Sequence, residues 1–406
     1  MNPAFPFTRR ASANVGANVG ARVSAIGTGL AIGLAGLAAQ AAPTVYHAVD
    51  LQVLNNSAPA LSSFGEGIAS GGGVAGYAAT GIGSEVHAVR HSGGVLQDLG
   101  SLGAGLNSWG YGINASGQVI GGSQIVAPNT IPHATIFDGT TIKDIGAAGG
   151  TQYASLGLGI SNKGNATGIA SQYFDGLGGR IDSAFFYDGT TLHDIGTLGG
   201  QVAVGRAVND QGRVAGLSLT GIGEANHAFY YDGQKMIDIG TFGGQNSAAY
   251  GINSQGDAVG GAYLASGNGG PDEEEHAFIY RNGQLIDIGT LQGSARSEAH
   301  GINDLGWVVG TSSRGDDTTG FLFDGQQMFD LAGLITDGFN GWQITEISGI
   351  NDAGQIVGTG SRDGVTHAFR FDPFQSSSVP EPASLALVLA ALGVMALAGS
   401  RRPRAI

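Results

Sequence analysis

Five of the nine histidines recur at one position of a repeated pattern, where a ring of imidazoles is a candidate metal site. They are His87, His133, His227, His276 and His367. Equivalent copies in a ring would lie too far apart to share one ion, because metal–nitrogen bonds are about 2 Å long. In two further copies Ser183 and Thr319 replace the histidine, and both can still form a hydrogen bond. The pattern therefore predicts a structural role and no metal site.

Repeated aspartates and asparagines offer oxygen ligands. The aspartates precede a glycine-rich segment and are Asp98, Asp144, Asp194, Asp238, Asp287 and Asp330. We expect them to accept hydrogen bonds from the backbone of that segment rather than to act in catalysis. The Asn-Asp-x-Gly segments at Asn209, Asn303 and Asn351 resemble calcium loops, but the later glutamate of an EF-hand is missing. Turn formation is the favoured interpretation of these segments, and calcium binding is the alternative.

The strongest feature that the copies do not share is an acidic loop, Asp272-Glu273-Glu274-Glu275. One unit later, Asp316-Asp317 takes the equivalent place. Loops at equivalent positions of neighbouring units are expected on one face of the molecule, where loops carry function. A solvated run of charge is the favoured interpretation. The alternative is a site for a basic partner or a weakly bound divalent cation, and no other cofactor is expected.

Catalytic signatures are missing from the chain. It contains no nucleophile elbow, no phosphate-binding Gly-Lys-Ser/Thr and no His-Glu-x-x-His, and its Gly-x-Gly strings follow the repeat. We therefore assign no catalytic residue and expect a protein that is not an enzyme. Acids and histidines are numerous enough to leave an enzyme as the alternative.

The elements that position these residues are repeats. Seven units of roughly 47 residues lie between Tyr46 and Phe371, a period typical of stacked supersecondary units. Each unit contains four runs that alternate like β-strands. The first run ends in Gly-Ile-Asn, the second follows a tight turn, the third begins with His-Ala-Phe or its variant, and the fourth holds the aspartate. Asp-Gly or Asn-Gly between the last two runs predicts a two-residue hairpin, as at Asp232-Gly233 and Asn282-Gly283. Four antiparallel strands of this total length match one propeller blade.

The last unit is incomplete, and the missing strand occurs at the other end. At Asp372-Pro373 proline replaces the hairpin glycine, and no fourth run follows. Val49-Asp50-Leu51 precedes the first complete unit and matches Ile286-Asp287-Ile288. We therefore predict an all-β, seven-bladed β-propeller over residues 44–373, closed by an N-terminal strand that completes the last blade and removes exposed edges. An open β-solenoid is the alternative fold.

The repeats resemble the bacterial HAF extracellular repeat family. The resemblance rests on His-Ala-Phe at His227, His276 and His367, on Asp-Ile-Gly-Thr-Leu-Gly-Gly and on Gly-Ile-Asn-Asp-x-Gly. It covers nearly all of the chain between the two terminal segments, and it implies an exported repeat protein. The family carries no established chemistry to transfer.

The N-terminus reads as an export signal over residues 1–41. Arg9, Arg10 and Arg22 precede or flank an apolar stretch, and Ala39-Gln40-Ala41 has the small-x-small form of a cleavage site, with Ala39 and Ala41 as its small residues. Ordinary secretion through the Sec machinery is the favoured interpretation, and a twin-arginine signal is the alternative.

The C-terminus has three parts in order. A serine-rich linker at 374–378 leads into Val379, Pro380, Glu381 and Pro382; the apolar run 383–399 follows, and Arg401 and Arg402 come next. The run is at the short limit for a transmembrane helix, and the terminal arginines are expected to stay cytoplasmic. The segment 379–406 resembles the PEP-CTERM sorting signal of Gram-negative bacteria. This resemblance implies an exosortase as partner, an inner-membrane intermediate held by the C-terminal helix, and release to the cell surface or the medium. A plain C-terminal anchor is the alternative.

The amino-acid composition limits the classes of molecule that this protein is expected to bind. The chain has no cysteine, so no disulfide holds the exported domain. Removal of both ends takes six arginines and leaves 12 basic against 32 acidic residues, a formal charge of −20. Such a charge argues against nucleic acid or anionic lipid as a partner. We therefore expect a non-catalytic binding or scaffold protein at the cell surface or in the exopolysaccharide of a biofilm matrix, with polysaccharide or protein as partner. A polysaccharide-active glycosidase or lyase is the alternative, and an ice-binding protein is a lesser one.

Overall fold

The computed structural model describes residues 45–54, 61–125, 131–146, 153–173, 180–221, 225–265, 274–315 and 317–374. The predicted export signal with Ala39 and Ala41, the linker after Phe374 and the whole segment 379–406 lie outside these residues, as do Asp272, Glu273 and Asp316. The described ranges are almost entirely β, and their one helix is the 3₁₀ turn η1 (Leu331–Gly333). No helix within them is long and apolar enough to cross a membrane.

The strands form antiparallel sets of four that follow the repeat. The first three sets are β2 (Ser63–Ile68), β3 (Val74–Ala79), β4 (Val86–Ser92), β5 (Val95–Asp98); β6 (Ser108–Ile113), β7 (Val119–Ile125), β8 (Ile131–Phe137), β9 (Ile142–Gly146); and β10 (Ser155–Ile160), β11 (Ala166–Tyr173), β12 (Arg180–Tyr187), β13 (Leu192–Gly196). The next three are β14 (Ala203–Val208), β15 (Val214–Leu219), β16 (Asn226–Tyr231), β17 (Met236–Gly240); β18 (Gly243–Ile252), β19 (Ala258–Leu264), β20 (Glu275–Arg281), β21 (Gln284–Gly289); and β22 (Arg296–Ile302), β23 (Val308–Arg314), β24 (Asp317–Phe323), β25 (Met328–Asp330). One parallel residue pair, Glu275 with Arg296, joins the last two sets into an eight-stranded sheet.

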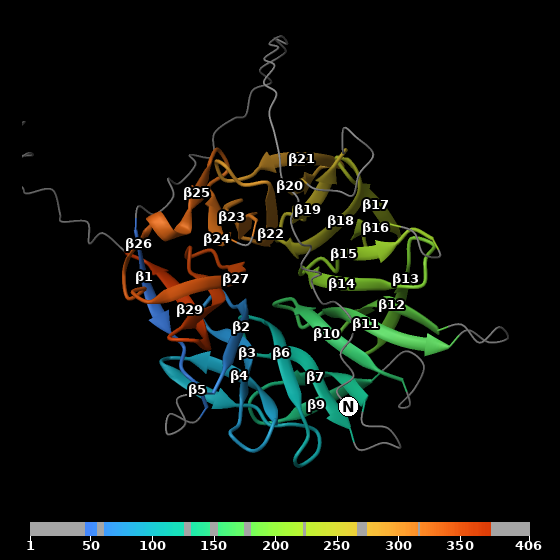
Figure 1. The fold of residues 1–406 in the computed structure, drawn as a ribbon. Helices are drawn as coiled ribbons and strands as arrows, with labels where there is room; N and C mark the ends of the chain where they lie inside the picture. Colours follow the sequence, from blue (N-terminus) through green and yellow to red (C-terminus); the bar gives the residue numbers. More distant parts are fainter. Residues whose placement is uncertain are drawn as a thin grey trace, which may run out of the picture.

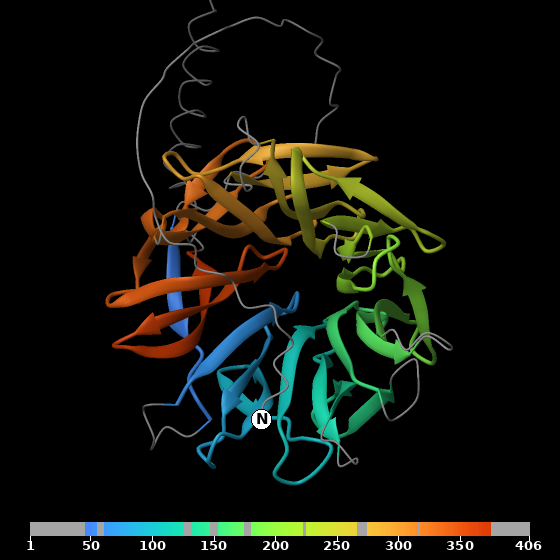
Figure 2. The same ribbon diagram turned by 45° about the vertical axis from the view of Figure 1, so that its right-hand side comes forward.

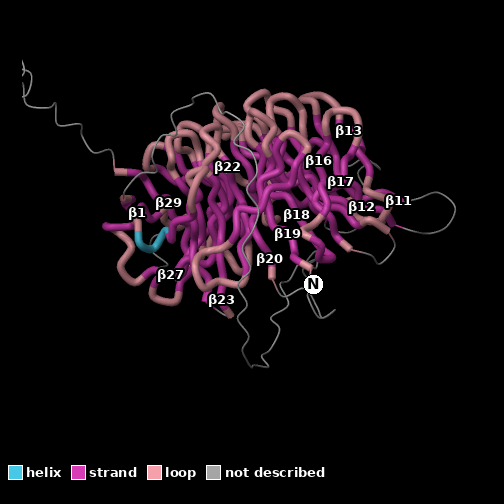
Figure 3. Tube along the Cα trace, turned by 90° about the horizontal axis from the view of Figure 1, so that it is seen from above, coloured by secondary structure: helices cyan, strands magenta, loops and turns pink. Residues whose placement is uncertain are grey.

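The remaining sheet contains both ends of the described chain. Its strand order is β26 (Ile335–Asp337), β1 (Tyr46–Asp50), β29 (Val365–Pro373), β28 (Ile356–Arg362) and β27 (Trp342–Ile350). The sheets stand around a common centre, with the first strand of each set innermost and the fourth at the rim (Figures 1 and 2). Seen from above, the strands run between two faces along which the loops gather (Figure 3). The protein is therefore an all-β propeller.

The third strand of each set explains how neighbouring sheets pack. In β16, Ala228 and Phe229 are fully buried, and the Ala228 N–H donates to the Ser247 hydroxyl on β18 of the next set at 2.8 Å. The small alanine allows this approach, and the phenylalanine fills the space between the sheets. The equivalent bond recurs along the chain, from Ala88 to Ser108, from Ala134 to Ser155 and from Ala277 to Ser297.

The repeated histidines pair with the repeated aspartates within one sheet. His276 Nδ1 lies 2.8 Å from Asp287 Oδ2, and the other Asp287 oxygen accepts the Gly289 N–H at 2.7 Å. The same pairing joins His87 to Asp98, His133 to Asp144, His227 to Asp238 and His367 to Asp50. Where threonine replaces histidine, Thr319 donates to Asp330. The predicted structural role of both residue types is confirmed, and each aspartate serves the backbone beside it as expected.

The hairpins after the third strand differ in part from the prediction. At Asn282-Gly283 both residues have positive φ and form the two-residue loop as predicted. At Asp232 the loop is shifted by one residue: the Asp232 N–H bonds the Lys235 carbonyl, and Gly233, with φ +97°, takes the first central position. The aspartate lies outside the loop because its carboxylate accepts the N–H groups of Gln234 and Lys235.

The N-terminal strand pairs with the last unit, as predicted. Residues 46–50 of β1 pair antiparallel with β29, and Asp50 faces Phe369. The last sheet also bonds to the first set through contacts like those between successive sets: the Ala368 N–H donates to the Ser63 hydroxyl at 3.1 Å. Tyr46 and Leu51 are almost completely buried in this region.

Asparagine side chains link the turns that follow the innermost strands. Asn303 accepts the Leu305 and Trp307 N–H groups of its own turn and donates to the Asn351 carbonyl of the next turn at 3.0 Å. Asn351 in turn donates to the Ala69 carbonyl of the first set at 3.0 Å. The turn chemistry predicted for these segments is present, and it also connects neighbouring sheets.

Candidate functional site

Each innermost strand has a β-bulge at one equivalent position. On β2, Gly65 and Gly67 pair with the consecutive residues Gly76 and Ala75, so Glu66 has no partner in the ladder. The residues skipped in this way on β2, β6, β10, β14, β18, β22 and β27 are Glu66, Tyr111, Leu158, Arg206, Tyr250, His300 and Ser348. A bulge bends its strand and re-aims a side chain. Side chains of different chemistry are therefore presented at one structural position.

Glycines after the bulges bring the innermost strands close together. A Cβ on Gly67 would lie 2.7 Å from the carbonyl oxygen of Tyr111, and one on Gly251 would lie 2.9 Å from that of His300. Contacts of this length do not occur for real side chains, so only glycine permits this spacing. The close approach holds the bulged residues around a single space.

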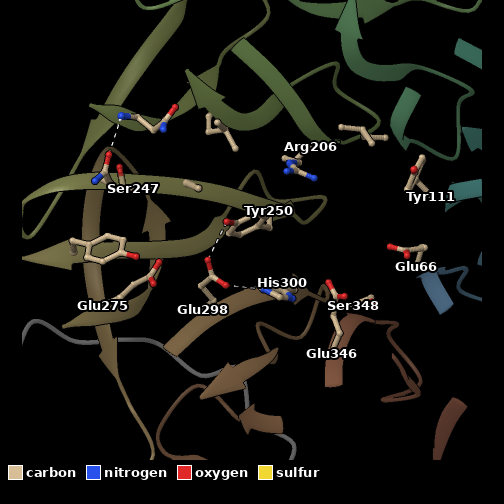
Figure 4. A pocket seen from close by; sticks show the side chains of 16 residues that line it. Glu66, Tyr111, Arg206, Ser247, Tyr250, Glu275, Glu298, His300, Glu346 and Ser348 are labelled. Atoms are coloured by element: carbon tan, nitrogen blue, oxygen red, sulfur yellow. Dashed lines mark hydrogen bonds and ion pairs between the residues drawn. The ribbon is translucent and has the colours of Figure 1, made fainter. Parts of the chain in front are cut away.

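The bulged residues line one central cavity of about 600 Å³ (Figure 4). The wall is completed by residues from the ends of neighbouring strands, including Glu275, Glu298, Glu346, Tyr263 and Asn226. Four glutamates thus share the wall with one arginine, one histidine and three tyrosines. The cavity is polar and strongly acidic.

One side of the cavity holds a connected group of three side chains. The Tyr250 hydroxyl donates to Glu298 Oε1 at 3.0 Å, and His300 Nε2 lies 3.5 Å from Glu298 Oε2 (Figure 4). His300 Nδ1 lies 2.8 Å from the Ile347 carbonyl oxygen, to which it donates. Both ring nitrogens therefore face oxygen atoms, an arrangement that favours the imidazolium.

Burial and neighbouring charges shift the pKa values of several side chains in the cavity. Burial first and the charge of Glu346 second raise the pKa of Glu66, Arg206 and His300 oppose the shift, and the resulting pKa is about 8. Burial alone would lower the pKa of His300, but Glu298 and Glu346 raise it above its ordinary value. The pKa of Tyr250 is raised well above its usual range by burial and by Glu298. At neutral pH the Glu66 carboxyl is therefore mostly protonated and able to donate a hydrogen bond.

Three charged side chains of the cavity wall lack an ion-pair partner among the described residues. Within the described part of the chain, the side chains of Glu66 and Glu346 form no hydrogen bond or ion pair. Arg206 stacks over the Tyr250 ring at 5.6 Å, and its Nε is buried with no hydrogen-bond partner. A buried donor without a partner costs free energy, and this Nε is closed off from the cavity that the rest of the Arg206 side chain lines.

The acidic loop reaches the cavity through its last residue. Glu275 is 7% exposed and lines both the central cavity and a second one of about 390 Å³ between β18–β21 and β22–β25. Glu274 is exposed beside it, and Asp317 is exposed at the start of β24. Thr318, next to Asp317, lines the second cavity. Glu275 of the first loop therefore lines this cavity, and Asp317 of the second loop precedes a residue that lines it. No group of three or more potential metal ligands occurs among the described residues.

The position that lines the cavity was not singled out from the sequence. It is the one residue that changes inside an otherwise repeated segment, Gly/Ala/Ile-x-Gly/Ala-Ile/Val. This variation is a signal that sequence reasoning could have used. The direction of the side chain at this position could not be deduced from the sequence. Regular strand alternation without a bulge gives no reason for that side chain to face a common centre.

Comparison with known proteins gives one motif and two solved structures of low similarity. Residues 378–402 match the family model of the PEP-CTERM protein-sorting motif. The motif implies export through a C-terminal signal and processing by an exosortase. No match to a curated protein was found. Among solved structures, the chain is similar to the β-propeller domain of the Trilobed protease from Pyrococcus furiosus, with 13% identity, a TM-score of 0.49, and coverage of 77% of this chain and 96% of that one. It is also similar to a Trypanosoma rangeli sialidase, with 10% identity, a TM-score of 0.34, and coverage of 83% and 56%.

Proposed function

We propose that this protein is an exported, exosortase-sorted β-propeller that binds a ligand in its central cavity. It acts as a non-catalytic binding or scaffold protein at the cell surface or in the exopolysaccharide matrix. The observation that carries the proposal is the convergence of the variable, bulged residue of every unit on one cavity. Its volume of about 600 Å³ falls within the roughly 300–1,000 Å³ typical of ligand sites.

We infer further that the strand sets form a closed ring of seven blades. The Ala368–Ser63 bond supports this inference because it repeats the bond between successive sets. The Asn351–Ala69 bond supports it in the same way at the turns. β1 supplies the strand that the last unit lacks. The resemblance of the repeats to the HAF family belongs to the same proposal.

Export and sorting can be tested by mass spectrometry of the protein recovered from its own host. We expect a mature chain that begins near Ala42 and ends near the Pro380-Glu381-Pro382 segment. A chain intact through Ile406 would contradict exosortase processing and favour a plain membrane anchor.

Ligand binding can be tested with a variant that fills the cavity. Leu158 is one of the bulged residues, and Leu158→Trp adds an indole to the wall. We expect the mature wild-type protein to bind polysaccharide or protein extracted from the host envelope, and the variant to lose this binding while keeping its thermal unfolding midpoint. Ile82→Trp is the matched control, because Ile82 is 71% exposed and outside the cavity. Binding that Leu158→Trp leaves unchanged would refute the cavity as the binding site.

A polysaccharide-active enzyme is the second candidate, and one observation favours it. The cavity wall holds Glu66, protonated at neutral pH, and Glu346, whose charge raises the pKa of Glu66. A protonated acid beside a second carboxyl group is the arrangement used in glycoside hydrolysis. Hydrolysis of host polysaccharide by the wild type, abolished in both Glu66→Gln and Glu346→Gln, would establish this function in place of the non-catalytic one.

A further inference from the structure

We propose that the central cavity recognises a ligand with an ammonium group and nearby acceptor oxygens, the ammonium lying between Glu66 and Glu346 and an oxygen facing Arg206. The proposal rests on the proposed function and specifies the ligand class. Amino sugars and lysine-like side chains share this chemistry, and the test below distinguishes them.

The first argument is the pair of carboxyl groups without partners. Glu66 lies on β2 and Glu346 on β27, and their charges interact although no described side chain bridges them. Both side chains are only partly buried and line the cavity, whereas a charged group that the chain itself satisfies is paired or hydrogen-bonded. Glu298, on the other side of the cavity, is held in this way by Tyr250 and His300. The contrast marks Glu66 and Glu346 as groups whose partner is supplied from outside the chain.

The second argument is the unpartnered donor on Arg206. Its guanidinium is held over the Tyr250 ring, which fixes its position, and its buried Nε meets no acceptor. Arg206 and Glu66 interact electrostatically, yet they form no ion pair within the described structure. The Nε itself is closed off from the cavity, so a ligand that bears both a cation and an acceptor oxygen would contact Glu66 and the part of Arg206 that lines the wall.

The third argument is the charge and surface of the wall. With Glu66 protonated, the three other glutamates of the wall still outnumber Arg206 and His300, so the wall favours a cation over a simple anion. Tyr111 and Tyr250 belong to the same wall. Aromatic rings beside carboxylates are favourable surroundings for an ammonium group.

Protonation of Glu66 predicts how binding depends on pH. In the free protein a proton occupies this carboxyl at neutral pH, because its pKa is about 8. An ammonium ligand replaces that proton. The titratable groups that face Glu66 and share its electrostatics come from several strands and are Glu346, Arg206, His300, Tyr111 and Tyr77. Affinity is expected to rise by about 50-fold from pH 6 to pH 8, as the ionised fraction of Glu66 rises from about one hundredth to one half.

The test is isothermal titration calorimetry of the mature exported protein with two matched pairs of probes. Nα-acetyl-lysine is compared with Nα-acetylnorleucine, and glucosamine with glucose, so each pair differs in one ammonium group. We expect the ammonium member of at least one pair to bind ten-fold or more tightly than its neutral partner. The pH series uses Nα-acetyl-lysine or, if only the sugar binds, 1-amino-1-deoxysorbitol, because aliphatic amines stay protonated to about pH 10.

Glu66→Gln and Glu346→Gln remove one charge each with almost no change in shape. Each is expected to weaken binding about ten-fold or more, since hydrogen bonds to charged groups contribute ~1.5–3 kcal/mol, and Glu66→Gln is expected to abolish the pH dependence. Glu274→Gln, at an exposed glutamate outside the cavity wall, is the control and should change neither the affinity nor its pH dependence.

The outcomes separate this proposal from the proposed function. Preference for glucosamine identifies an amino sugar, and preference for the lysine derivative identifies a peptide or amino acid. Equal binding within both pairs, absence of binding by all four probes, or unchanged binding in Glu66→Gln overturns the ammonium site. If envelope ligands still bind and Leu158→Trp blocks them, the cavity remains the binding site and only the ligand class is wrong.

Discussion

Replacement of Glu66 by glutamine should make the protein more stable at high pH and leave it nearly unchanged at low pH. The pKa of this carboxyl rises from about 4.5 in the unfolded chain to about 8 in the folded protein. The folded state therefore binds more protons between these values, so the stability present below pH 4.5 is lost as the pH rises through 8. Glutamine cannot ionise and avoids this loss.

The pKa shift of Glu66 sets the size of the stability difference between Glu66→Gln and the wild type. At 1.36 kcal/mol per unit of pKa, a change from 4.5 to about 8 corresponds to at most ~5 kcal/mol. The cavity is open enough to admit water, which reduces the cost of ionisation, so we expect about 3 kcal/mol at pH 9. The other titrating groups are common to both proteins and cancel in the difference to first order.

The assay is urea unfolding of wild type and Glu66→Gln at intervals from pH 5 to pH 9, followed by tryptophan fluorescence. The unfolding free energy of the variant minus that of the wild type should grow steadily with pH. The same comparison with Glu274→Gln should stay flat, because Glu274 is exposed. A difference for Glu66→Gln that does not change with pH would refute the reasoning that burial and Glu346 hold this carboxyl protonated.

Three further predictions concern the fold. Deletion of residues 44–54 should lower the unfolding free energy by ~5 kcal/mol or more, since Tyr46, Leu51 and Val53 are buried and each such side chain contributes ~1.5–3 kcal/mol. Deletion of 374–378 is the control and should have little effect. Equal losses of unfolding free energy in chemical denaturation would argue against the N-terminal strand as part of the sheet. Gly67→Ala should destabilise the protein by ~2 kcal/mol or more, because the new Cβ would lie 2.7 Å from the Tyr111 carbonyl oxygen. Gly71→Ala is the control and should be neutral, because its Cβ would meet nothing within 4 Å. A melting temperature lowered equally by both substitutions would contradict the close-approach argument. Gln52→Gly should stabilise by up to ~1 kcal/mol, because Gln52 has φ +70° where five of the six other units have a glycine with positive φ, such as Gly100 and Gly289. A lower melting temperature would show that the glutamine side chain outweighs the backbone strain.

Much of the architecture follows from local patterns. The recurrence of roughly 47 residues with four alternating runs predicted four-stranded antiparallel sets, because strand alternation and turn residues are short-range properties. The segment around Asp50 matches the fourth strand of the other units, and this match predicted that it pairs with the third strand of the last unit. It does pair with that strand, β29. The His-Ala-Phe segment predicted the start of the third run in the same way, and His227-Ala228-Phe229 lies in β16, the third strand of its set. The three parts of the C-terminus predicted the sorting motif that residues 378–402 match.

Other features depended on the tertiary structure. The position of the hairpin loop at Asp232 and Gly233 is set by which backbone groups the carboxylate reaches, and the dipeptide alone does not determine it. The acidic loop 272–275 stood out by its charge, but only the register that places Glu275 beside Arg296 brings one of its residues to a cavity.

The sequence by itself determined the unit, its four strands and the sorting signal, because each depends on residues that are neighbours in the chain. The cavity was decided by tertiary structure. Glu66, Arg206 and His300 are separated by dozens of residues or more, and they meet because bulges turn single side chains toward an axis that no one unit contains. The shifted pKa values of Glu66 and His300 arise from burial and from neighbouring charges at that axis, which are properties of the assembled sheets.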